Sequence, residues 1–192
     1  VYKITYNLNG GTNSSENPAE YTVNSADIVF SDPEKVGYTF KGWFTNPGCT
    51  AQITGITQGM LGDKVLYAGW EVIEYSITYE LNGGKQISSN VQSYTVDDRD
   101  ILLNEPEKEH YKFSGWYSDA SFLTKITVIK KGSTGDKTFW AKWEANSYTV
   151  RFEGNEAESG DMNAQVFTYD SEQPLTKNTF TRNGYTFSGW AK

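Results

Sequence analysis

The chain has 192 residues, of which 24 are acidic and 17 are basic, so its formal net charge is −7. This balance argues against nucleic acid, whose phosphates require a basic surface, and against anionic membrane leaflets. No apolar run approaches the roughly 20 residues of a membrane-spanning helix, so no direct membrane insertion is expected. Cys49 is the only cysteine, which leaves no internal disulfide and no cysteine-based zinc site. Packing of the aromatic residues, 15% of the chain, must therefore hold the fold together.

The first predicted element is a strand over residues 2–8. Its apolar residues alternate with polar ones and fall on one face: Tyr2, Ile4, Tyr6 and Leu8. This is the period of a strand with one buried side. Residues 9–11, Asn-Gly-Gly, end the strand, because asparagine and glycine accept positive φ in turns.

A second short strand is predicted at residues 21–23. The best helix candidate follows it, one or two turns at residues 25–30, with an equivalent at residues 97–103. Helix propensity is weak in both segments, since Val, Ile and Asp dominate.

The third strand places Tyr38, Phe40 and Phe44 on one face, with Trp43 out of phase. Either Gly42 forms a bulge that turns Trp43 inward, or the indole covers the opposite face of the sheet. We favour the bulge, because a glycine precedes the tryptophan each time this segment recurs. The last strand places Leu66, Ala68 and Trp70 on one face.

The whole pattern returns from Tyr75 onward. Residues 75–84 repeat residues 2–11, and the same spacing between equivalent positions holds without a gap to Trp143. A third copy begins at Tyr148 and reaches Gly184–Trp190 one residue late. The sequence therefore predicts three domains: residues 1–73, residues 74–146, and residues 147–192, the last truncated and without its final strand. The short connections, 71–74 and 144–147, predict an elongated array.

The aromatic rings that recur in phase form the predicted structural core of the copies. They are Tyr6, Tyr38, Phe40, Trp43 and Trp70 in the first copy, Tyr79, Tyr111, Phe113, Trp116 and Trp143 in the second, and Tyr185, Phe187 and Trp190 in the third.

No catalytic residue, metal ligand or cofactor is predicted. His110 is the only histidine, so it has no second histidine for a metal site, and it is interpreted as a loop residue. Cys49 has no evident partner base. Residues 97–100, Asp-Asp-Arg-Asp, lack the spacing of a calcium loop and are interpreted as a solvated turn.

The rival function is carbohydrate binding through exposed rings. Trp140 falls on the polar phase of its strand, where the first copy has Tyr67. These two residues are the weak candidates for ligand contact, although single exposed aromatic residues are common. An outward ring would equally suit a protein contact.

Three recurring patterns together resemble the Listeria–Bacteroides repeat, also called the internalin-type B repeat. They are Tyr-x-Ile-Thr-Tyr-x-Leu-Asn-Gly-Gly from Tyr2, Gly-Tyr-Thr-Phe-x-Gly-Trp from Gly37, and Leu-Tyr-Ala-x-Trp from Leu66. His110 departs from the pattern, since it replaces the glycine before Tyr111.

The resemblance implies an α+β fold that is predominantly β, with small β-grasp-like (ubiquitin-related) repeats in tandem. It also implies a secreted or wall-anchored bacterial protein, outside the cell, with the export signal and the anchor beyond these residues. There such repeats act as a non-enzymatic stalk or spacer of a surface adhesin, with adhesion through protein contacts as a further expected role. The expected partners are the adjacent repeats of the parent chain and a host or bacterial surface protein or glycan.

Overall fold

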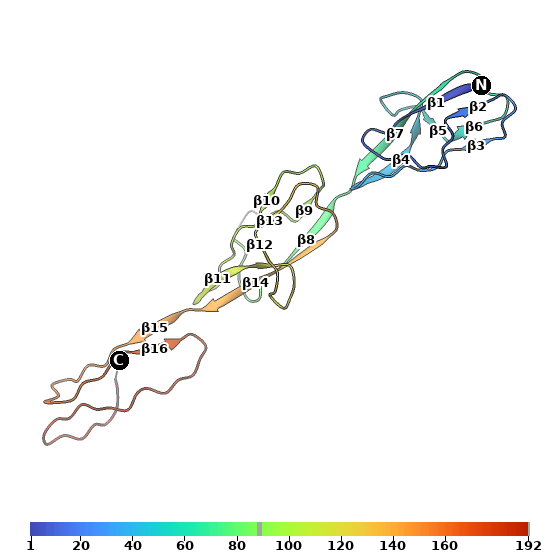
Figure 1. Ribbon diagram of the computed structural model, residues 1–192. Coiled ribbons are helices and arrows are strands. Elements are labelled where there is room, and N and C mark those ends of the chain that lie inside the picture. The colour runs from blue at the N-terminus through green and yellow to red at the C-terminus, as the bar shows by residue number, and fades with distance from the viewer. Residues whose placement is uncertain (88–89, 192) are drawn as a thin grey trace. The chain divides into compact units, whose positions relative to one another are not determined.

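The computed structural model describes residues 1–87 and 90–191, and all regular structure in these ranges is β (Figure 1). The expected α+β class with β-grasp-like units is therefore wrong. The two helix candidates contain short strands instead, β3 (Ile28–Val29) and β10 (Ile101–Leu102). Each pairs with a distant short strand, so its backbone groups are satisfied across a sheet and not within a helical turn. Within the described residues, no helix is able to span a membrane.

The first copy has a five-stranded sheet in the order β2-β1-β7-β4-β5. Its strands are β1 (Tyr2–Asn7), β2 (Glu20–Tyr21), β4 (Tyr38–Phe44), β5 (Gln52–Ile53) and β7 (Lys64–Val72). The central strand β7 runs parallel to β1 and antiparallel to β4. A two-stranded sheet of β3 and β6 (Gly55–Ile56) packs on it, because Phe30 and Ile56 share a buried cluster with Ile4 and Leu66.

The second copy repeats this arrangement. Its strands are β8 (Tyr75–Glu80), β9 (Ser93–Tyr94), β10, β11 (Tyr111–Tyr117), β12 (Lys125–Ile126), β13 (Val128–Ile129) and β14 (Lys137–Ala145). They form a sheet in the order β12-β11-β14-β8-β9 and a small sheet of β10 and β13. The third copy contains the antiparallel pair β15 (Ser147–Val150) and β16 (Gln165–Thr168).

By its packing, the chain divides into two compact units whose boundary runs through the second copy. Unit 1 comprises Val1–Thr78, Val91–Leu102 and Val128–Lys137, and unit 2 comprises Tyr79–Asn90, Leu103–Thr127 and Thr138–Lys192. The whole first copy therefore shares unit 1 with part of the second copy. The rest of the second copy shares unit 2 with the third copy.

The predicted bulge is confirmed in both complete copies. The register between β4 and β7 shifts between Phe40 and Gly42, and that between β11 and β14 shifts at the equivalent place. Trp43 points into the core with 2% of its surface exposed. Gly42 has φ +130°, a conformation that residues with a Cβ rarely adopt. The indole Nε1 of Trp43 donates to the carbonyl oxygen of Ser31 at 3.2 Å, so the buried polar atom is satisfied.

Candidate functional site

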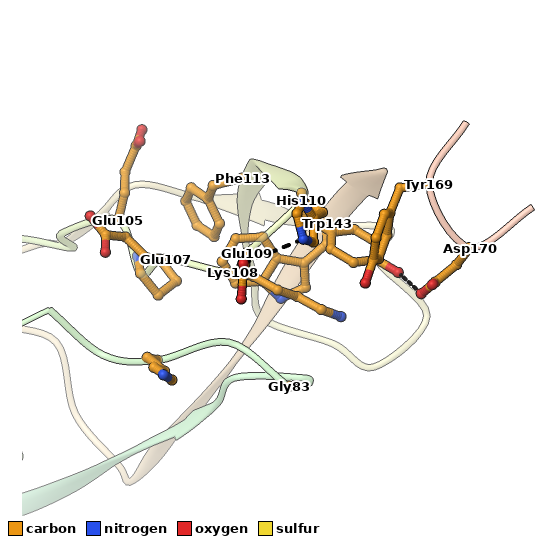
Figure 2. Close-up of a pocket in the computed structure, with 13 residues that line it drawn as sticks. Gly83, Glu105, Glu107, Lys108, Glu109, His110, Phe113, Trp143, Tyr169 and Asp170 are labelled. Carbon is orange, nitrogen blue, oxygen red and sulfur yellow. Dashed lines mark hydrogen bonds and ion pairs between the residues drawn. The ribbon is translucent and has the colours of Figure 1, made fainter. Parts of the chain in front are cut away.

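A cavity of about 860 Å³ opens on the second copy, and all of its lining residues belong to unit 2 (Figure 2). We call it the second-copy groove. Its walls come from the turn after β8, the segment 105–110 that leads into β11, the start of β11, strand β14, and the two residues that follow Thr168. Its aromatic lining residues are Tyr111, Phe113, Trp143 and Tyr169.

Trp143 is held firmly in this groove. Its Nε1 donates to the carbonyl oxygen of Leu81 at 2.9 Å, and its ring meets Phe113 edge-on with the centroids 5.4 Å apart. Gly84 leaves room for the indole, because a Cβ atom there would lie 2.4 Å from Cζ2 of Trp143. The Asn-Gly-Gly turn is therefore needed for close packing against the ring as well as for chain reversal.

Charged side chains surround the rings. Nζ of Lys108 lies 4.1 Å from the centroid of Tyr111 and donates to the carbonyl oxygen of Asn82 at 3.1 Å. The carboxylates of Glu105, Glu107 and Glu109 belong to the same lining. Rings beside cations and carboxylates can stack on a ligand and form hydrogen bonds with it, so this arrangement is suited to binding.

One side of the groove is formed by residues at the start of the third copy. His110 stacks on Tyr169, with the ring centroids 4.4 Å apart and the planes 28° from parallel, and Figure 2 shows the two rings together. The hydroxyl of Tyr111 donates to the carboxylate of Asp170. This hydrogen bond raises the pKa of Tyr111 above its usual value, because it stabilises the protonated phenol.

Similar grooves occur on the other two copies. On the first copy a cavity of about 320 Å³ is lined by Lys35, Tyr38 and Trp70, and Nζ of Lys35 lies 3.8 Å from the centroid of Tyr38. On the third copy a cavity of about 650 Å³ is lined by Arg182 and Tyr185, with 4.2 Å between the guanidinium carbon and the ring centroid. A cation over a tyrosine is thus a recurring feature of the repeat.

The rings predicted as core differ in burial. Trp43 and Trp116 are each 2% exposed. Partly buried are Tyr6, Tyr38, Phe40, Trp70, Tyr79, Tyr111, Phe113, Trp143 and Trp190. Tyr185 and Phe187, by contrast, are 69% and 49% exposed. In the first copy the equivalent residues, Tyr38 and Phe40, pair with β7.

The structure does not bring Tyr67 and Trp140 into any of the three grooves. Tyr67 lies on β7 opposite Phe44, and Trp140 lies on β14 opposite Tyr117. Both are partly buried. The candidate ligand contacts were thus expected on the sheet. The cavities instead form where turns meet the segments that precede β4 and β11.

His110 lies in the turn before β11, as its interpretation as a loop residue predicted, but its ring contact was not predicted. It lies between the second and third copies and contacts Tyr169, which is distant in the sequence. A signal for this contact exists in the repeat. At the spacing that relates Tyr2 to Tyr75, His110 and Tyr169 correspond to Gly37 and Val96, so both residues change together between the two copies.

The chain is an array of all-β repeats, and each copy carries a groove that is lined in part by aromatic rings. Residues 2–69, 75–142 and 148–192 match the Listeria-Bacteroides repeat domain, so the chain belongs to this family and the resemblance is confirmed. A putative membrane protein of Evansella cellulosilytica is 36% identical over 192 residues, covering 99% of this chain and 28% of that protein. Internalin H of Listeria monocytogenes is 30% identical over 160 residues, covering 81% of this chain and 25% of that protein.

The chain thus spans only about a quarter of the length of these relatives. Among solved structures, domains 3–4 of a cell-surface protein with Streptococcal High Identity Repeats in Tandem (SHIRT) show 16% sequence identity. The TM-score is 0.24, over 76% of this chain and 99% of that chain.

Proposed function

We propose that the chain is a non-enzymatic spacer module of a bacterial cell-surface or secreted protein. Its domains would be residues 1–73, 74–146 and 147–192, and its immediate partners the adjacent repeats of the parent chain. The observation that carries this proposal is the recurrence of the same hydrogen-bonded contact between copies: Tyr38 to Asp97 in unit 1, and Tyr111 to Asp170 in unit 2. The names of the relatives, an internalin and putative membrane proteins, agree with a place at the cell envelope.

The spacer proposal predicts how far the array carries an attached domain. Residues 1–146 are inserted once or twice between a surface anchor and a fluorescent reporter, and the array is displayed on a bacterium. We expect the distance between reporter and membrane, measured by energy transfer to a membrane dye, to increase with the second insertion. A Gly/Ser linker of equal length is the control, because a flexible coil extends only with about the square root of its length. An array that reaches no farther than this linker would contradict the proposal.

Carbohydrate binding is the second candidate, and the recurring cation-and-ring grooves favour it. If the module is only a spacer, titration with host and bacterial oligosaccharides should leave its tryptophan fluorescence unchanged. A saturable change that is lost in Trp140→Ala would instead support the sheet-face contacts at Tyr67 and Trp140. A saturable change that persists in Trp140→Ala and is lost in Lys108→Ala would support the second-copy groove. Either saturable change would show that the array does more than separate domains.

A further inference from the structure

Two contacts between neighbouring copies are made by residues at equivalent positions of the repeat. In unit 1 the hydroxyl of Tyr38 donates to Oδ2 of Asp97 in the second copy at 2.5 Å. Beside it, within the first copy, the amide of Ile73 donates to the carbonyl oxygen of Gly37 at 2.9 Å. At the equivalent positions in unit 2, Tyr111 donates to Asp170 in the third copy, and within the second copy the amide of Asn146 donates to the carbonyl oxygen of His110 at 2.9 Å. The Tyr–Asp hydrogen bond between copies and the backbone hydrogen bond beside it therefore recur at equivalent positions.

Beside these hydrogen bonds, the side chains at one pair of contacting positions differ between the two units. In unit 1, Gly37 packs on Val96, which is 8% exposed, and a Cβ atom at position 37 would lie 2.2 Å from Cγ1 of Val96. Real Cβ atoms do not approach so closely, so no side chain fits there while Val96 keeps its place. In unit 2 the two positions hold His110 and Tyr169, whose rings stack.

The backbone has the same shape in both cases, because φ is +78° at Gly37 and +64° at His110. Histidine adopts this left-handed conformation at some cost, and its stacking on Tyr169 offsets that cost. The difference between the two contacts therefore lies in the side chains, and the two residues of each pair have changed together.

We infer that these two positions form matched pairs that determine which repeat fits against which. A copy that carries glycine accepts a neighbour with valine, and a copy that carries histidine accepts a neighbour with tyrosine. The Tyr–Asp hydrogen bond is present in both kinds of contact and stabilises each of them. The end surface of each copy is thus a binding surface whose partner is an adjacent repeat with the complementary residue.

The test is a pair of exchange cycles in the full chain. The first cycle compares Gly37→His, Val96→Tyr and the double variant, and the second compares His110→Gly, Tyr169→Val and their double variant. The readout is the hydrogen-exchange rate of the Ile73 amide in the first cycle and of the Asn146 amide in the second. Both amides donate to the carbonyl group of the exchanged residue.

We expect each single variant to increase the exchange rate of its reporter amide on the order of tenfold. Each double variant should return this rate to within about threefold of the parent rate. The reason is that substitutions at contacting residues are energetically coupled. Gly59→His is the matched control, because Gly59 also has positive φ, +87°, but a Cβ atom there meets nothing within 4 Å. It should leave the Ile73 amide unchanged. Protection of the β7 and β14 amides verifies folding.

A double variant whose fold increase in exchange rate equals the product of the two single-variant increases would overturn the inference. Single variants that exchange like the parent chain would overturn it as well. The two cycles substitute in opposite directions, one adding rings and one removing them. If the bulky substitutions in the first cycle unfold the copy, the second cycle still decides the question.

Discussion

Trp116→Ala is expected to lower the free energy of unfolding of the second copy by about 3–5 kcal/mol, the range for removal of a buried tryptophan. The ring is 2% exposed and packs edge-on against Tyr79 and Phe113, with centroids 5.2 and 5.5 Å away. Its loss also leaves the carbonyl oxygen of Asn104 without the indole donor at 2.9 Å. Urea unfolding followed by circular dichroism measures the change, with the first copy as an internal reference.

Trp140→Ala is the matched control for this measurement. It removes the same side chain from β14, but from a partly buried position on the sheet. We expect a clearly smaller loss of stability than for Trp116→Ala. Equal losses in the two variants would contradict the assignment of Trp116 to the core of the second copy.

Gly84→Ala is expected to lower the stability of the second copy by about 1–3 kcal/mol through overpacking. The added methyl group would lie 2.4 Å from Cζ2 of Trp143 and 3.1 Å from the carbonyl oxygen of Glu107. The indole cannot move away easily, because its Nε1 is bonded to Leu81. Urea unfolding gives the energy, and the indole N–H resonance of Trp143 reports whether the ring has shifted.

Substitutions at two further glycines provide a parallel test and a control for this prediction. Gly11→Ala should have a similar effect in the first copy, because a Cβ atom there would lie 2.5 Å from Cζ2 of Trp70. Gly48→Ala is the control, since its nearest neighbour would be 3.6 Å away. Its effect should stay within about 0.5 kcal/mol, as for most surface substitutions. A Gly84→Ala chain as stable as Gly48→Ala would show that the turn tolerates a side chain.

The local residue pattern predicted those strands whose own sequence shows an alternation or a glycine that marks a bulge. Alternation over residues 2–8 identified the strand that buries Ile4, and the glycine before Trp43 indicated the bulge. The helix candidate at residues 25–30 was wrong for a physical reason. Two aliphatic residues, Ile28 and Val29, suit a helix or a strand, and the partner that decides between them, β6, lies much farther along the chain, beyond β4 and β5.

The groove and the contacts between copies could not be predicted in the same way. Trp143 was singled out as a recurring ring, but its neighbours in the groove come from separate segments, and Tyr169 belongs to the next copy. Tyr38 and Asp97 lie in different copies, and the motifs that contain them give no sign that the two side chains meet. Only comparison of equivalent positions between the copies reveals such pairs.

The pairing of Gly37 with Val96 and of His110 with Tyr169 limits how the gene for such an array can change its length. Unequal recombination that removes residues 74–146 would join the first copy directly to the third. Gly37 would then face Tyr169 in a mismatched contact, although the reading frame would be preserved. Arrays built in this way should lose or gain repeats in combinations that restore matched residues at each contact. Their evolution should therefore conserve pairs of contacting residues as well as whole repeats.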